Sequence, residues 1–171
     1  MKKITISLGV FLLLAVGSIV VALAVTRPQR SSKQTHAPAA HIMIAPDEVK
    51  WGPAPPALPA GAQVAVLEGD PGKAGATFTI RAKFPDGYKV APHWHPTDER
   101  VTVLQGALGV GLGDTFNASA GRELGVGGYA EMPRAVRHFA WAVGETVIQI
   151  SAIGPFEVNY VNPADDPRKA K

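Results

Sequence analysis

The sequence contains no cysteine among its 171 residues. Disulfide bonds therefore cannot hold the fold, and no thiolate is available as a metal ligand or as a nucleophile. The absence also excludes a lipoprotein anchor, since that anchor needs a cysteine at the cleavage site. Chains without cysteine occur in oxidising and in reducing compartments, so this absence does not indicate where the protein works.

Charge is also scarce, because only 18% of the residues are charged and no acidic or basic tail is present. The formal net charge is +3, and Lys2 and Lys3 supply two of these charges. The rest of the chain is close to neutral and contains no basic cluster with interleaved aromatic side chains. We therefore expect no nucleic-acid partner.

The one long apolar run lies at the N-terminus, from Ile4 to Val25, and contains no charged residue. The run is longer than the apolar core of an ordinary secretory signal and long enough to span a bilayer. Residues 22–24 nevertheless have the small-x-small form of a signal-peptidase site. We predict that residues 1–26 are a cleaved signal peptide or an inner-membrane anchor formed by residues 4–25. Either alternative makes the folded domain periplasmic or secreted, with the membrane contacted only through this segment.

The composition changes after this run. Residues 27–41 are rich in Ser, Gln, Thr, Pro and Ala, which predicts a flexible linker. We expect the remainder, residues 42–171, to form a single domain.

Beyond the leader, no window of a dozen residues shows an apolar stripe at helical spacing. Short apolar or alternating runs follow one another instead, separated by many of the 18 glycines and 15 prolines. Such a pattern predicts an all-β sandwich or closed barrel. The expected strands are residues 63–68, 77–83, 100–104, 107–112, 129–132, 138–143, 146–153 and 156–161.

Two proline-containing segments predict local structure. The sequence Gly-Asp-Pro-Gly at residues 69–72 is a strong turn signal, so the first two expected strands are predicted to form a hairpin. Residues 53–59 (PAPPALP) cannot join a central sheet because proline lacks the backbone donor. We expect this segment to be an extended strap on the surface.

His93 and His95 are the first candidate metal ligands. Residues two apart on a strand face the same side, so both imidazoles can reach one ion. Glu99 follows a turn-like stretch that can return its carboxylate to the same side. Imidazole and carboxylate together suit Fe, Mn, Ni, Cu or Zn rather than Ca or Mg. We therefore expect one divalent transition metal.

The spacing around these residues resembles the first sequence motif of the cupin superfamily. Its fixed positions are occupied by Gly87, His93, His95, Glu99 and Gly106. Five such positions coincide by chance on the order of 10⁻⁷ per starting point. The resemblance covers about residues 62–160.

The second cupin motif is matched in part, by Gly127, Pro133 and His138 at the family's offsets. Ala135 stands where the motif has a glycine, and Ala142 where it has an asparagine. Since both positions are structural in the family, the turn near Ala135 is expected to differ while the ligand set stays intact.

The resemblance implies a fold, a metal site and an activity. The fold is a double-stranded β-helix, or jelly-roll cupin barrel, here preceded by an N-terminal hydrophobic helix. The metal ligands are His93, His95, Glu99 and His138, and this set is similar to that of metal-dependent cupin dioxygenases. Glu99 would then serve as a ligand and as a proton acceptor, the substrate would be a small molecule, and barrels of this superfamily commonly pair as homodimers.

A second interpretation belongs to a different class. Cupins also include binding or sensor domains, among them domains of the ChrR type, that hold a metal or small ligand without turnover. The single small domain favours this alternative, as does the lack of a convincing substrate-binding arginine inside the barrel.

Side chains beside the ligands are candidates for the wall of the metal cavity. Alternation along the expected strands places some of them on the ligand face, and aromatic side chains near the histidines are candidates for its rim. The candidate lining residues are Phe78, Ile80, Tyr88, Trp94, Ala140 and Gln149.

Overall fold

The computed structural model describes residues 41–169. The predicted leader at residues 1–26, with its hydrophobic helix, lies outside the described residues, as does the expected linker apart from residue 41. Within residues 41–169, no helix has the length and apolar composition that a membrane crossing requires.

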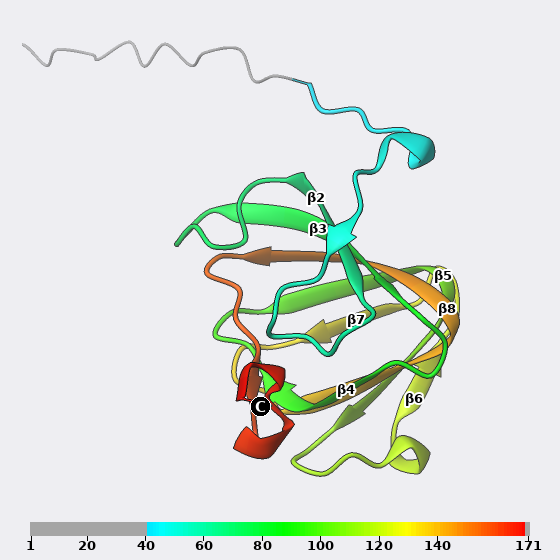
Figure 1. Ribbon diagram of the computed structural model, residues 1–171, viewed down its shortest axis with the longest axis vertical. Coiled ribbons are helices and arrows are strands. Elements are labelled where there is room, and N and C mark those ends of the chain that lie inside the picture. Colours follow the sequence, from blue (N-terminus) through cyan, green and yellow to red (C-terminus); the bar gives the residue numbers. More distant parts are fainter. Residues whose placement is uncertain (1–40, 170–171) are drawn as a thin grey trace, which may run out of the picture. The chain divides into compact units, whose positions relative to one another are not determined.

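The predicted all-β jelly-roll fold is confirmed in the described part of the chain, where helical structure is limited to short 3₁₀ turns (Figure 1). The strands are β1 (Gly52–Pro53), β2 (Gln63–Glu68), β3 (Thr77–Phe84), β4 (Lys89–Trp94), β5 (Glu99–Leu112), β6 (Arg122–Leu124), β7 (Tyr129–Met132), β8 (His138–Ile153) and β9 (Asn159–Tyr160). The 3₁₀ turns are η1 (Pro46–Glu48), η2 (Ala118–Ala120), η3 (Pro163–Asp165) and η4 (Pro167–Lys169).

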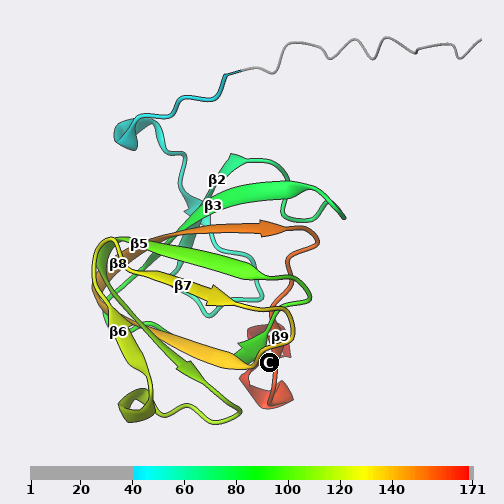
Figure 2. The same ribbon diagram turned by 180° about the vertical axis from the view of Figure 1, so that it is seen from behind.

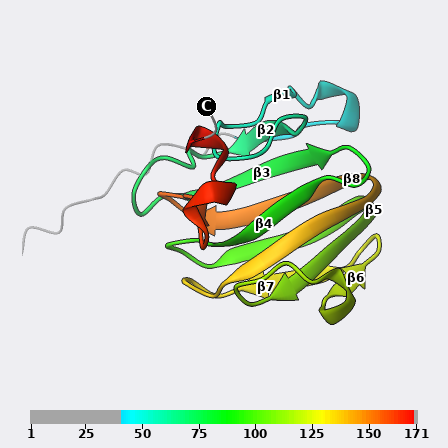
Figure 3. The same ribbon diagram turned by 60° about the horizontal axis from the view of Figure 1, so that its bottom comes forward.

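All strand pairs are antiparallel, and the two long strands β5 and β8 belong to both layers of the barrel. The second half of β8 and the first half of β5 form one layer, in the order β1-β2-β3-β8-β5-β7. The first half of β8 and the second half of β5 form the other, in the order β9-β4-β8-β5-β6. Figures 2 and 3 show the strands curling from one layer into the next.

The continuity of β5 and β8 corrects the sequence-based prediction, which divided each of them into two strands. The pairing between them continues through the expected breaks and is only irregular between Val103 and Ala107. Gly106 lies there with φ +67°, and a Cβ atom would come within 2.4 Å of the Glu145 carbonyl oxygen. A tight glycine bend therefore replaces the expected chain break, because the backbone donors and acceptors stay paired across it.

The inner face of each layer supplies the core. Along β3 burial alternates, so that Phe78 and Ile80 point inward while Thr79 and Arg81 point outward. The outward side chains pair across to β8, where the Arg81 Nε donates to the Gln149 side-chain oxygen over 3.3 Å. Burying one large apolar side chain contributes about 1.5–3 kcal/mol, so the alternation strongly specifies this register. The expected hairpin between β2 and β3 is also present.

A smaller aromatic cluster covers the outer face of β8. Phe116, from the loop after β5, packs on Phe139 and Trp141 with ring centroids 4.9 and 5.9 Å away. Glycines on the neighbouring strand make room for these rings. A Cβ atom at Gly109 would lie 1.9 Å from the Trp141 ring.

Two segments, each with one short edge strand of the sheet, are mostly loop. The proline-rich strap is tied down by the Tyr88 hydroxyl, which donates to the Pro59 carbonyl, and by the Tyr160 hydroxyl, which donates to the Ala57 carbonyl. The expected strand at residues 156–161 is wrong in extent, since only β9 is paired with β4. The rest of that segment is loop, because it leaves β8 and crosses toward β4 (Figure 1).

Candidate metal centre

Four side chains meet between the two layers at one end of the barrel. His93 near the end of β4 pairs directly with His138, the first residue of β8. Glu99 is the first residue of β5, in the opposite layer. His95 follows β4 by one residue and points toward the same place. The structure therefore brings together all four candidate ligands, three from residues 93–99 and the fourth from the distant strand β8.

The ligand atoms of these residues lie close enough to share one ion. One ligand atom from each of the three histidines lies within 4.8 Å of the others. The Glu99 Oε2 atom is 3.4 Å from His95 Nε2 and 3.4 Å from His138 Nε2. All four residues are at most 6% exposed. This is the arrangement that a small mononuclear centre requires, with each donor supplied by a buried side chain.

Backbone carbonyls orient the three imidazoles. The Nδ1 atoms of His93, His95 and His138 lie 2.8, 2.7 and 3.0 Å from the carbonyl oxygens of Ala91, Glu157 and Val136. A carbonyl only accepts, so each Nδ1 carries the proton and donates. Each Nε2 atom then carries the lone pair that a metal ligand needs. Phe156 stacks on the His95 ring at 4.3 Å and holds it further.

One further observation indicates that the donor set suits a metal ion. His95 Nε2 is buried and has no hydrogen-bond partner. Two imidazole lone pairs and a carboxylate oxygen facing one another, with no cation between them, are an unfavourable arrangement in a buried site. A shared cation removes the conflict, and imidazole nitrogen with one carboxylate suits a transition metal.

Electrostatics act differently on the groups of this cluster. Burial would lower the pKa of His95, but Glu99 and the Glu157 carbonyl outweigh it and raise this pKa. A metal ion therefore has to displace a proton from His95. Burial, with smaller contributions from His138 and His95, lowers the pKa of His93 to about 3. Burial alone would raise the pKa of Glu99, but His95 and His138 outweigh it and hold the pKa of this carboxyl well below its usual range. His93 is therefore neutral and Glu99 anionic at neutral pH, as coordination demands.

A cavity of about 320 Å³ adjoins the four side chains. Its wall is mainly apolar and includes Val101, Leu108, Met132, Ile148 and Ile150. Sites for small organic ligands commonly combine such a wall with a few polar groups at one place. The candidate centre therefore has room for a small molecule beside it.

The candidate lining residues separate into two groups. Ile80 and Ala140 line the cavity, whereas Phe78, Tyr88, Trp94 and Gln149 are not among its lining residues. Phe78 packs on Phe156 in the core, with ring centroids 5.3 Å apart. Tyr88 stacks on Phe84 at 4.9 Å, and Trp94 is half-buried at the end of β4.

Gln149, another candidate lining residue, does not line the cavity. Gln149 lies on the outer face with Arg81, because alternation along β8 places Ile148 and Ile150 inward. The polar side chain in an apolar strand therefore has an outward partner rather than a place at the site.

Sequence reasoning missed the lining residues that come from outside the barrel strands. Ala57 and Leu58 of the strap line the cavity, and so does Arg168 of η4. The prediction that no arginine lies inside the barrel holds for the strands, none of which contributes an arginine to the cavity wall. It overlooked η4, which contributes Arg168. Nothing in the local sequence around Arg168 indicates its position, since only the path of the folded chain brings it there.

Comparison with protein families finds one match over most of the chain. The model of the family described as the ChrR cupin-like domain matches residues 39–157. A comparison with curated proteins finds no match.

Three solved structures with the same fold are distant in sequence. One is KdgF from Halomonas sp., which is 23% identical, with 67% of this chain and 96% of that chain covered and a TM-score of 0.51. The polyketide cyclase RemF from Streptomyces resistomycificus is 20% identical, with 75% and 90% covered and a TM-score of 0.57. A candidate acetylacetone dioxygenase from Methylibium petroleiphilum PM1 is 22% identical, with 77% and 88% covered and a TM-score of 0.58. At these identities the likeness concerns the fold alone.

Proposed function

The chain belongs to the ChrR cupin-like family, and from this premise we propose that it is an exported metalloenzyme of the dioxygenase type acting on a small molecule. Membership gives the fold and not the chemistry, so the proposal depends on the site. The observation that carries it is the convergence of three histidines and Glu99 on one buried point beside an apolar cavity.

The residues of the site would have separate roles in metal binding, substrate binding and proton transfer. His93, His95, Glu99 and His138 would hold one divalent transition metal, with positions left open for small ligands in a five- or six-coordinate ion. Such an ion supplies Lewis-acid and redox chemistry toward bound oxygen donors. The apolar wall would orient the substrate and exclude water. Glu99, an anion inside this wall, could also accept a proton from an enolic or catecholic substrate.

The test begins with elemental analysis of the purified full chain. We expect one equivalent of Fe, Mn, Ni, Cu or Zn per chain. Oxygen uptake is then measured against enediols, flavonols and catechols, and it should disappear in the variant His95→Ala because one ligand is lost. The matched control is His41→Ala, which removes an exposed histidine outside the site.

Two results would change the assignment. Tight metal binding without oxygen uptake for any substrate class would place the protein among the binding or sensor cupins. A full chain that contains no transition metal, and takes none up on dialysis, would contradict the metal site itself.

Export is the second part of the proposal and rests on the apolar run from Ile4 to Val25. Fractionation of a bacterial host, followed by sequencing of the mature N-terminus, tests it. A new N-terminus near residue 25 would indicate cleavage, and a full-length chain in the membrane fraction would indicate an anchor. Recovery of the full-length chain in the cytoplasmic fraction would contradict export.

A further inference from the structure

The cavity beside the metal centre has one permanently cationic residue among its described lining residues. Arg168, from the 3₁₀ turn η4 near the C-terminus, lines this cavity together with the histidine cluster and Glu99. The family match ends at residue 157, so Arg168 belongs to a part of the chain beyond it. Every other lining residue is apolar apart from the four candidate ligands and Glu157.

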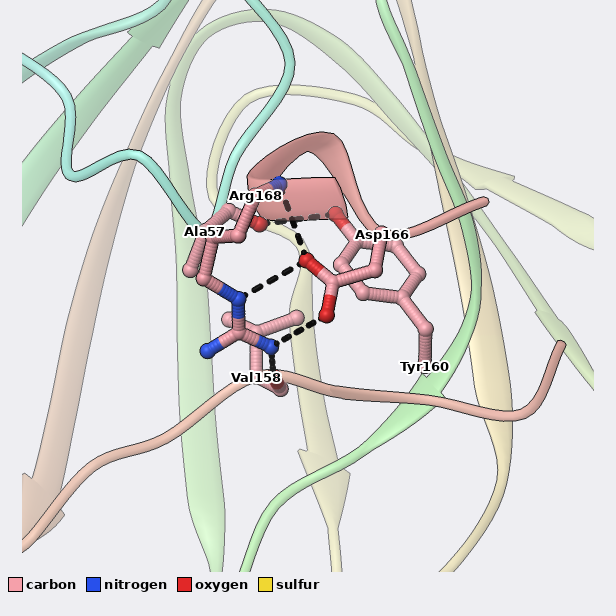
Figure 4. A network of polar contacts seen from close by, with 5 residues as sticks. All are labelled: Ala57, Val158, Tyr160, Asp166 and Arg168. Carbon is pink, nitrogen blue, oxygen red and sulfur yellow. Dashed lines mark hydrogen bonds and ion pairs between the residues drawn. The ribbon is translucent and has the colours of Figure 1, made fainter. Parts of the chain in front are cut away.

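Arg168 is held in place by a compact network, which Figure 4 shows. Its Nε atom donates to Asp166 Oδ1 over 2.8 Å, and its Nη2 atom donates to Asp166 Oδ2 and to the Val158 carbonyl, each over 3.0 Å. The backbone N–H of Arg168 also donates to Asp166 Oδ1. Beside it, the Tyr160 hydroxyl donates to the Ala57 carbonyl and so ties the strap to β9.

The same loop orients the metal site and the arginine. The Glu157 carbonyl accepts the hydrogen bond from His95, and the next carbonyl, of Val158, accepts one from Arg168. Two consecutive peptide groups therefore fix the guanidinium relative to the histidine cluster. Arg168 is exposed, but these hydrogen bonds hold its guanidinium in one orientation, which is a preorganised arrangement.

The guanidinium has unused hydrogen-bonding capacity. An arginine carries five N–H donors in a planar fork. Nε and both hydrogens of Nη2 are occupied by Asp166 and Val158, whereas Nη1 has no partner among residues 41–169. In Figure 4 this nitrogen carries no dashed line. The Arg168 side chain is 44% exposed, so these two donors stay accessible to a ligand that reaches this part of the cavity wall. A planar anion is what such a pair of donors best accepts.

We propose that Arg168 recognises a carboxylate of the ligand, so that the ligand is a small organic acid. Such an acid would bind the metal through oxygen atoms at one end, lay an apolar body along the cavity wall, and place its carboxylate at Nη1. The inference rests on the proposed function for the metal end of the ligand. The arginine end does not depend on the metal and can be tested separately.

Succinylacetone and its methyl ester are the probes, since both carry the same metal-binding diketone and only the acid carries a carboxylate. Dissociation constants are measured by calorimetry on the metal-loaded full chain. We expect the acid to bind about 10–100-fold more tightly than the ester, as one charge-assisted hydrogen-bonded contact allows. In Arg168→Gln this preference should disappear while the affinity for the ester stays unchanged.

A second variant separates the effect of Arg168 on ligand affinity from that of Asp166. Arg168→Gln leaves the Asp166 carboxylate alone, and that charge would itself repel the acid. The double variant Asp166→Asn/Arg168→Gln removes both charges, and it should also bind acid and ester alike. The matched control, Asp114→Asn/Arg137→Gln, removes an exposed ion pair whose members do not line the cavity, and it should keep the preference.

Three outcomes would overturn the proposal: equal affinity for acid and ester in the natural sequence, an acid preference that survives in the double variant, or no binding of either probe at millimolar concentration to a sample that contains metal. Metal content is measured on the same samples, and the titrations are repeated after treatment with EDTA. Absence of metal would contradict the proposed function, whereas the ratio of acid to ester affinity in the EDTA-treated chain still reports on Arg168. The two failures are therefore distinguishable.

Discussion

At the residue scale, backbone carbonyls and backbone conformation prepare the site. Each imidazole donates from Nδ1 to a carbonyl, so each lone pair points the same way before any ion arrives. The Ala91 carbonyl belongs to β4, the Val136 carbonyl to the turn before β8, and the Glu157 carbonyl to the loop after β8. The site also holds the loop that carries Ala135, since the Ala135 N–H donates to the His95 carbonyl over 2.8 Å.

Ala135 carries a strained backbone conformation, with φ +63°, where the second cupin motif has a glycine. We expect Ala135→Gly to stabilise the protein, because left-handed backbone costs an ordinary residue about 1–2 kcal/mol and glycine's larger unfolded-state entropy takes back about 0.4–1 kcal/mol. The net gain should be about 0.5–1 kcal/mol, seen as a rise in the thermal midpoint of about 1–4 °C.

The control for this prediction is Ala120→Gly, at an exposed alanine without a positive φ. There glycine only adds freedom to the unfolded chain, so the midpoint should fall slightly or stay the same. Equal falls in both variants would show that Ala135 is not strained in the folded protein.

At the element scale, β5 and β8 hold the two layers together, and the packing between them depends on small residues opposite large ones. Gly109 on β5 lies opposite Trp141 on β8. We expect Gly109→Ala to destabilise the protein by about 1–3 kcal/mol, because the added methyl group overlaps the indole ring and the strands must separate. Chemical denaturation monitored by tryptophan fluorescence measures the difference.

Two companion variants identify the cause. Gly125→Ala places its methyl group where no atom lies within 4 Å and should change stability by less than about 0.5 kcal/mol. In a Trp141→Leu background, Gly109→Ala should reduce the stability clearly less, since the indole ring that the added methyl group overlaps is gone. The same cost in both backgrounds would mean that the ring is not the reason.

At the scale of the whole molecule, a metal bound by residues from β4, β5 and β8 would join both layers. The four donors come together only in the folded chain, so the metal should stabilise it by mass action, by about 4 kcal/mol at a thousandfold excess over the dissociation constant. We expect EDTA to lower the thermal midpoint of the natural sequence and of His41→Ala, and to leave that of His138→Ala unchanged. A midpoint insensitive to EDTA in a metal-containing sample would contradict this coupling.

Much of this organisation could be predicted from the sequence because it depends on short-range spacing. The alternation of β3 and the spacing of His93, His95 and Glu99 predicted the barrel and the group of side chains that meet in it. Those signals follow from strand geometry, in which residues two apart face the same side. The prediction was wrong where it divided β5 near Gly106 and where it placed Gln149 on the cavity wall. Neighbouring strands decide whether a bend ends a strand and which face a side chain meets.

The sequence by itself determined the fold class, the family and the four candidate ligands, since spacing along one chain is enough to specify them. Only the tertiary structure decided what surrounds them: continuous β5 and β8, an outward Gln149, and Arg168 at the cavity. The physical reason is distance along the chain. Arg168 lies 73 residues after His95 in the printed sequence, and no local pattern records that the closing of the barrel brings two such positions to one cavity.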